Sequence, residues 1–147
     1  MNKILAAISI VFAAGLLLAV PPSAFATQKE ACTPGYWKNN TDTNGFLGLD
    51  SINLQQWYID NYNVDLGSEA NITIAEGVAL KGGPLNAFLR YAAAAVYNIE
   101  AGLQYDTNKL QTALDRFEDG NLSGAIEKFE LIHSESTCPI DAFGNSI

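Results

Sequence analysis

The chain has 147 residues, of which 16 are acidic and 8 are basic, and its formal net charge is −8. This length suits one domain with a single modest core. The negative charge excludes nucleic acid and anionic lipid surfaces as favoured partners, because both are themselves negatively charged. Acidic surfaces are more often simply solvated than used for binding, so the charge does not by itself indicate a partner.

The first 26 residues have the pattern of an export signal. Lys3 gives a positive start, the 17 residues from Ile4 to Val20 are apolar or small, and Ala24-Phe25-Ala26 has the A-x-A form of a cleavage site. We expect cleavage after Ala26, which leaves residues 27–147 as a single secreted helical domain with no membrane contact. Its 7 basic and 16 acidic residues give a net charge of −9. The alternative is an uncleaved anchor, because about 17 apolar residues are the lower limit for crossing a bilayer.

The next feature is a pair of cysteines, Cys32 and Cys138, near the two ends of the exported part. In an oxidising compartment such a pair predicts one intramolecular disulfide. A thiolate zinc site usually needs four ligands, and the chain has a single histidine, His133. An intermolecular bridge is an alternative, and assembly into a homo-oligomer stays open.

The first half of the exported part predicts one loop and two helices. Thr33-Pro34-Gly35 and the following Asn, Thr and Asp residues favour loop or turn structure over residues 27–44. Residues 51–62 have the apolar spacing of an amphipathic helix that Asp50 or Ser51 would cap. Thr73 and Glu76 have the spacing of a capping box, and Gly82-Gly83 would end the short helix that follows.

The second half predicts three longer helices. Pro84 suits a first helical turn, and the positions that follow at steps of three and four are apolar: Leu85, Phe88, Leu89, Ala92, Val96 and Ile99. We expect this helix to be central to the core, with Arg90 satisfied by a salt bridge or by loop carbonyls. After an exit at Gly102, Asp106-Thr107 and Gly120-Asn121 begin two helices that form an antiparallel hairpin. The predicted fold is an all-α bundle of four or five helices closed by one disulfide.

Three segments together resemble one known family. Residues 32–39, CTPGYWKN, are similar to the opening motif of a family of exported bacterial and archaeal domains. Residues 85–98 resemble its Leu-Leu-Arg, alanine-rich helix, and Thr137-Cys138-Pro139 resembles its Cys-Pro close. The resemblance spans most of the mature chain and implies an extracellular, often modular, setting without a known activity. Asn40 stands where the family usually has a histidine, so we expect no role that depends on that histidine.

The segment from Asn40 to Ser51 partly matches a calcium-binding loop. Oxygen-bearing side chains alternate along it before a glycine, and the candidate ligands are Asn40, Asp42, Asn44 and Asp50. The first position is Asn instead of Asp, and the twelfth is Ser51 instead of Glu, so the bidentate carboxylate is missing. A calcium site and a plain Asn/Gly turn are therefore both open, and no other cofactor is expected.

Four aromatic residues are candidates for contact with a partner: Tyr36, Trp37, Trp57 and Tyr58. Amphipathic rings suit wet interfaces with sugars or proteins, although in a small domain such rings more often close the core. We keep both alternatives for this set.

No constellation of residues predicts catalysis. The single histidine has no nucleophile pattern around it, and we expect it at a surface or helix end, where a cation is favourable. Asp115, Glu118 and Asp119 cluster where a helix should end, and an exposed acidic helix end explains them better than acid-base chemistry does. We therefore expect a non-catalytic extracellular or cell-surface module with a structural, matrix or adhesion role, whose partner is a surface protein or glycan. The alternatives are a calcium-dependent binding module and a hydrolase with an acidic site.

Overall fold

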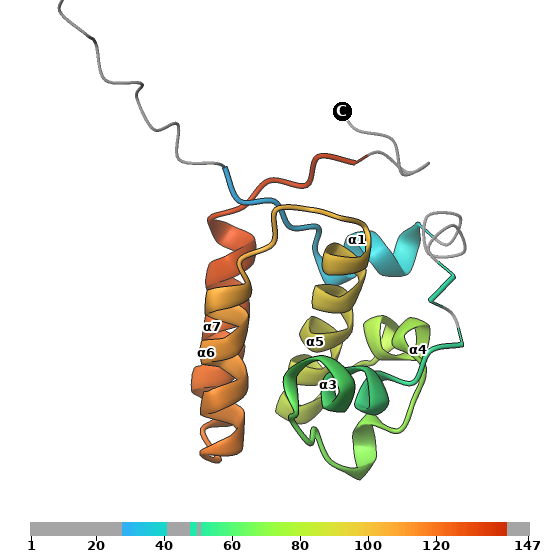
Figure 1. The fold of residues 1–147 in the computed structure, drawn as a ribbon, viewed down its shortest axis with the longest axis vertical. Helices are drawn as coiled ribbons and strands as arrows, with labels where there is room; N and C mark the ends of the chain where they lie inside the picture. Colours follow the sequence, from blue (N-terminus) through green and yellow to red (C-terminus); the bar gives the residue numbers. More distant parts are fainter. Residues whose placement is uncertain (1–27, 41–47, 50, 141–147) are drawn as a thin grey trace, which may run out of the picture.

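The computed structural model describes residues 28–40, 48–49 and 51–140, and these residues form helices joined by short connections (Figure 1). The described part contains no strand. The elements are α1 (Pro34–Asn39), α3 (Leu54–Tyr62), the 3-10 turn η1 (Ser68–Ala70), α4 (Ile74–Ala79), α5 (Pro84–Glu100), α6 (Thr107–Glu118) and α7 (Leu122–Ser134). The prediction of an all-α fold is confirmed.

Helix α1 lies where the sequence predicted a loop, and that part of the prediction is wrong. Thr33 is the N-cap, and its hydroxyl accepts a hydrogen bond from the Tyr36 backbone N–H at 3.2 Å. Pro34 occupies the first helical turn, where its fixed φ suits a helix and its missing N–H costs nothing. The residues that favour a turn therefore begin a helix here.

Helix α3 begins later than predicted, with Asn53 as its cap instead of Asp50 or Ser51. The Asn53 side chain accepts from the backbone N–H of Gln56 at 2.9 Å. The residues on either side of Asn53 pair with the segment before α4, since the N–H of Leu54 donates to Ile72 and the carbonyl of Ile52 accepts from Ile74. This pairing keeps the chain extended up to Asn53.

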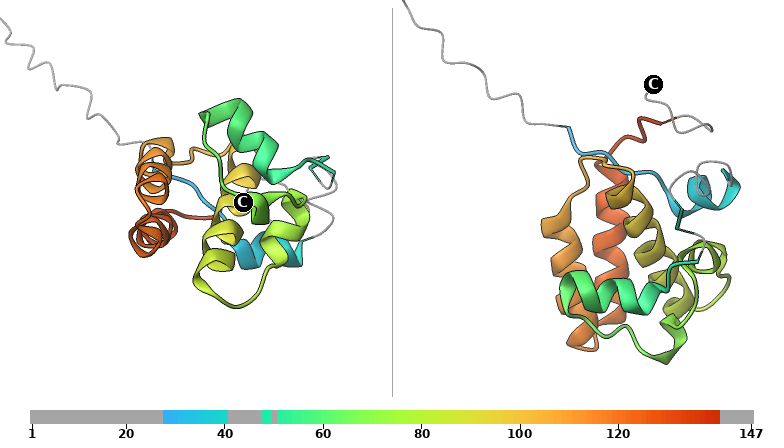
Figure 2. Two further views of the ribbon diagram at one scale, coloured as in Figure 1. Left: turned by 90° about the horizontal axis from the view of Figure 1, so that it is seen from below. Right: turned by 45° about the vertical axis from the view of Figure 1, so that its right-hand side comes forward.

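Helix α5 is the centre of the core, as predicted. Seven consecutive residues, 92–98, are buried, so this stretch is enclosed on all sides. Helices α1, α4 and α7 all pack against α5, and Figure 2 shows α5 between the α6–α7 pair and the shorter helices. Arg90 donates to the carbonyl of Leu80 at 3.1 Å, which confirms the expected anchor to a loop carbonyl.

Helices α6 and α7 form the predicted antiparallel hairpin and lie side by side in Figure 1. Asp106 and Asn121 cap their N-termini, and Gly120 takes a φ of 76° in the turn between them. Phe88 of α5 stacks on Phe117 of α6, with ring centroids 4.3 Å apart. This contact fastens the hairpin to the central helix.

The two ends of the described chain meet at one end of the molecule (Figure 1). The N–H of Ala31 donates to Thr137 at 2.9 Å, and the N–H of Thr137 donates to Lys29 at 3.2 Å. The predicted signal, residues 1–26, lies outside the described residues. Within the described ranges, no helix has the length and apolar character needed to cross a membrane.

Candidate functional site

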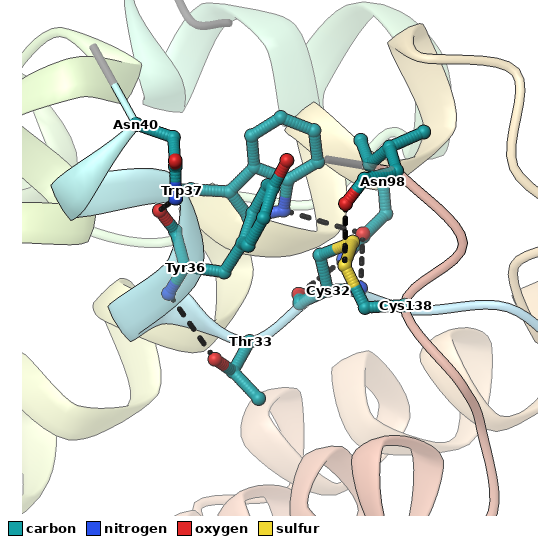
Figure 3. Close-up of a disulfide and its surroundings, with 8 residues drawn as sticks. Cys32, Thr33, Tyr36, Trp37, Asn40, Asn98 and Cys138 are labelled. Atoms are coloured by element: carbon teal, nitrogen blue, oxygen red, sulfur yellow. Dashed lines mark hydrogen bonds between the residues drawn. A yellow bond between two sulfur atoms is a disulfide. The ribbon is translucent and has the colours of Figure 1, made fainter. Parts of the chain in front are cut away.

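The predicted disulfide is present between Cys32 and Cys138, whose Cα atoms are 4.5 Å apart (Figure 3). Cys32 is fully buried and Cys138 is half-buried. Both cysteines of the chain are used in this bridge, so the intermolecular bridge and thiolate metal ligation do not apply to this structure. The bridge closes a loop that spans a sequence separation of 106 residues.

Asn98 of α5 holds the CTPGYWKN segment from inside the core. Its Oδ1 accepts from the backbone N–H of Cys32 at 2.7 Å and from Trp37 Nε1 at 3.2 Å. Its Nδ2 donates to the carbonyl of Cys32 at 3.0 Å. One fully buried amide therefore satisfies three polar groups of the motif (Figure 3).

Sequence reasoning missed Asn98. The available signal was a single polar residue inside the apolar run of residues 92–99, because a buried amide must have partners. The partners are 66 and 61 residues away in the chain, and no local pattern names them.

Trp37 completes this junction between α1 and α5. Its ring is fully buried and stacks on Tyr97 at 5.1 Å with an interplanar angle of 18°. Tyr36 meets Trp37 edge-on at 5.2 Å and is half-buried. The motif residues thus serve to seat the start of the domain on its central helix.

The four aromatic candidates do not form one partner surface. Trp57 is 7% exposed, and its Nε1 donates to Glu100 at 2.9 Å. Tyr58 is fully buried, and its hydroxyl donates to the carbonyl of Ala92 at 2.9 Å. Trp37 is also buried, so three of the four rings are part of the core. For these three, core packing is therefore the correct alternative, and partner contact is not. Tyr36 is the member that keeps a partly accessible ring.

Asn40 is the one candidate calcium ligand within the described residues. It follows α1, and its Nδ2 donates to the carbonyl of Tyr36 at 2.6 Å, so its amide serves as a helix cap. Asp42, Asn44 and Asp50 lie outside the described residues. Among the residues that the structure does describe, no three His, Cys, Asp or Glu side chains lie close enough together to hold a metal ion.

The acidic cluster at the end of α6 is exposed. Asp115, Glu118 and Asp119 all face solvent, and Asp115 accepts a hydrogen bond from Gln111 Nε2 at 2.8 Å. Acid-base catalysis usually takes place in a cleft that partly excludes water. Because all three carboxylates are exposed, the cluster resembles a solvated helix end.

His133 lies in the last turn of α7, as expected, but its side chain is half-buried. Its ring stacks on Tyr91 of α5 at 5.4 Å, and both ring nitrogens are buried without a hydrogen-bond partner in the described part of the chain. Burial lowers the pKa of His133 from 6.5 to about 4. The imidazole is therefore neutral at pH 7, and the expected cation at the helix end is wrong.

Comparisons of the chain with known protein families, with curated proteins and with solved structures found no match. The resemblance carried by residues 32–39 and 137–139 therefore stays a prediction. The geometry on which function can be argued is the junction of Cys32, Trp37, Asn98 and Cys138.

Proposed function

We propose that the chain is an exported, non-catalytic module of the cell surface or extracellular matrix that contacts a surface protein or glycan. The observation that carries this proposal is the structural role of the CTPGYWKN segment. Its most reactive group, the thiol of Cys32, is spent in a disulfide, and its largest side chain, Trp37, is buried against Tyr97. The segment is thus a structural closure of the domain.

The closure suits a protein that works outside the cell. A disulfide survives in an oxidising compartment, and a small core gains most from such a cross-link. The pattern of residues 1–26 supports export, and the resemblance to exported bacterial and archaeal domains points to the same setting. After cleavage of the signal, residues 27–147 would form an extracellular domain without membrane contact.

The decisive experiment is recovery of the protein from the surface of the producing cell, followed by mass spectrometry and chemical cross-linking. We expect a chain that begins at Thr27, a mass that corresponds to a closed disulfide, and cross-links to a surface protein or glycan. An uncleaved chain found inside the cell would contradict the proposal.

A hydrolase screen tests the non-catalytic part of the proposal. We expect no turnover of peptide, ester or polysaccharide substrates by the purified protein. The variant Asp115→Asn/Glu118→Gln/Asp119→Asn is the control. Activity in the natural protein that this variant lacks would show that the exposed acidic cluster is catalytic and would overturn the proposal.

A further inference from the structure

Three segments of the exported chain match the Asn-x-Ser/Thr pattern at which oligosaccharides are attached to exported proteins, and they begin at Asn39, Asn71 and Asn121. Thr41, which completes the first, lies outside the described residues. Asn71 and Asn121 are both exposed, so exposure does not distinguish them. Their hydrogen bonds do.

Asn71 lies on the surface between η1 and α4. Its backbone N–H donates to Ser68 at 3.1 Å, whereas its side-chain amide makes no hydrogen bond within the described part of the chain. Thr73 Oγ1 accepts from the backbone N–H of Glu76 at 3.1 Å as the cap of α4. A substituent on the Asn71 amide would therefore break no contact of the fold.

Asn121 is the cap of α7, and its side chain is engaged. Its Oδ1 accepts from the backbone N–H of Gly124 at 3.0 Å and from Ser123 Oγ at 3.3 Å. Its Nδ2 lies against the first turn of the helix, only 2.5 Å from the place that a Cβ on Gly124 would take. The hydroxyl of both patterns is thus held by the fold, and the asparagine amide is what distinguishes them: it is engaged at Asn121 and makes no hydrogen bond within the described residues at Asn71.

We propose that Asn71 is the acceptor of an N-linked oligosaccharide in the folded domain, and that Asn121 is not. In the transfer, Asn71 Nδ2 attacks C1 of a sugar carried on a polyprenyl pyrophosphate. The bond from C1 to the phosphate oxygen breaks, its electron pair leaves with the pyrophosphate, and the new bond joins C1 to Nδ2. One amide proton passes to a carboxylate of the transferase. The proposal rests on the export proposed above, because a protein meets such transferases during or after export.

The Asn71 site lies at a defined end of the domain. The loop that carries η1 lies at the end of the molecule opposite to the two chain ends, as the side views in Figures 1 and 2 show. A sugar on Asn71, the residue that follows η1, would thus be attached at the end of the domain opposite to the disulfide.

The test compares the folded and unfolded forms of the full chain. Each form is incubated with membrane vesicles that contain an oligosaccharyl transferase and a polyprenyl-pyrophosphate-linked oligosaccharide, and the glycopeptides are mapped by mass spectrometry. In the folded, disulfide-closed protein we expect Asn71 to be occupied over Asn121 by about fivefold or more, the factor that corresponds to the loss of one helix cap. In the reduced and denatured chain we expect both to be occupied to a similar extent.

Two variants sharpen the result. Asn71→Gln should abolish the glycopeptide of the folded protein, whereas Thr73→Ser keeps both the pattern and the cap and should retain it. A folded chain without sugar at Asn71, or with Asn121 occupied as fully as Asn71, would overturn the inference. The vesicle assay does not depend on the signal segment, so its failure is distinct from a failure of export in the producing cell.

Discussion

Asn98 is the residue on which the seating of the CTPGYWKN segment depends. The variant Asn98→Ala would leave the N–H and carbonyl of Cys32 and the Nε1 of Trp37 without their partner inside the core. Each buried polar group left unpaired costs about 1 to 3 kcal/mol. We expect the free energy of unfolding, measured in urea, to fall by about 3 kcal/mol or more.

The matched control is Asn86→Ala, on the same helix. Asn86 is half-buried and donates one hydrogen bond, to the carbonyl of Lys81 at 2.9 Å. Solvent can replace that bond, so we expect a loss below about 1 kcal/mol. Similar losses for the two variants would show that Asn98 is not the support inferred here.

His133 predicts a dependence of stability on pH. Burial lowers the pKa of its imidazole to about 4 in the folded protein, while the unfolded chain has the ordinary value of 6.5. Between these values the unfolded chain binds more protons, so stability is full above pH 6.5 and is lost as the pH falls toward 4. The loss is at most about 3 kcal/mol, which urea unfolding at a series of pH values would measure.

Carboxyl groups also titrate in the lower part of this range, so the natural protein alone does not isolate the histidine. The variant His133→Phe keeps an aromatic ring on Tyr91 and cannot be protonated. We expect the difference in unfolding free energy between the variant and the natural protein to grow from pH 6.5 to pH 4. A constant difference would contradict the burial of a neutral imidazole.

At the scale of elements, the longer helices could be predicted because their signals are local. Pro84 and Asp106 mark helix starts that lie next to regular apolar spacing, and the α6–α7 turn carries Gly120 at positive φ. Helix α1 could not be predicted in this way, because Thr33-Pro34-Gly35 suits a turn and a helix start equally. What decides for the helix is the burial of Trp37 against α5, a contact between distant parts of the chain.

Two apolar residues of the segment around α3 are exposed. Ile52 is 37% exposed and Ile59 is 40% exposed, although both lie within residues 51–62, which the sequence predicts as an amphipathic helix. The helix begins at Leu54, so Ile52 precedes it, and the buried face is set by Leu54, Trp57 and Tyr58. Ile59 lies five positions after Leu54, outside the face that positions i, i+3 and i+4 share, so its side chain is turned away from the buried side of the helix.

Helices α4 and α5 approach closely at Gly77, and this contact gives a prediction at the element scale. A Cβ on Gly77 would lie 2.7 Å from the Cβ of Ala93, too close for two carbon atoms. Gly77→Ala should therefore force the helices apart and lower the free energy of unfolding by about 1 to 3 kcal/mol, the range for an overpacked core. Thermal unfolding followed by circular dichroism would measure the change.

Gly35→Ala is the control for this contact. Gly35 is also helical, and a Cβ there would meet its nearest neighbour, Thr33 Oγ1, at an ordinary 3.7 Å. Alanine favours a helix over glycine, so this variant should be neutral or slightly more stable. If Gly77→Ala behaved in the same way, the close approach of α4 and α5 would not be a constraint on the fold.

At the scale of the whole molecule, two kinds of contact hold the ends of the domain together. The disulfide joins Cys32 to Cys138, while backbone hydrogen bonds join Ala31 and Lys29 to Thr137 beside it. The hydrogen bonds from Asn98 reach Cys32 independently of Cys138. The start of the domain is thus fixed to the core by Asn98 independently of the bridge, whereas the segment after α7 is held by the bridge together with the hydrogen bonds of Thr137.

This division predicts what loss of the disulfide does. In the chain-entropy model, a cross-link across 106 residues stabilises the folded state by about 4 to 5 kcal/mol, so Cys32→Ala/Cys138→Ala should lose about that much in urea unfolding. Because Asn98 still holds residue 32, hydrogen exchange in the folded variant should increase after Ser134 more than around Trp37. Reductant should destabilise the natural protein and leave the double variant unchanged. Equal stability of the oxidised and reduced protein would show that the bridge does not act as the closure of the domain.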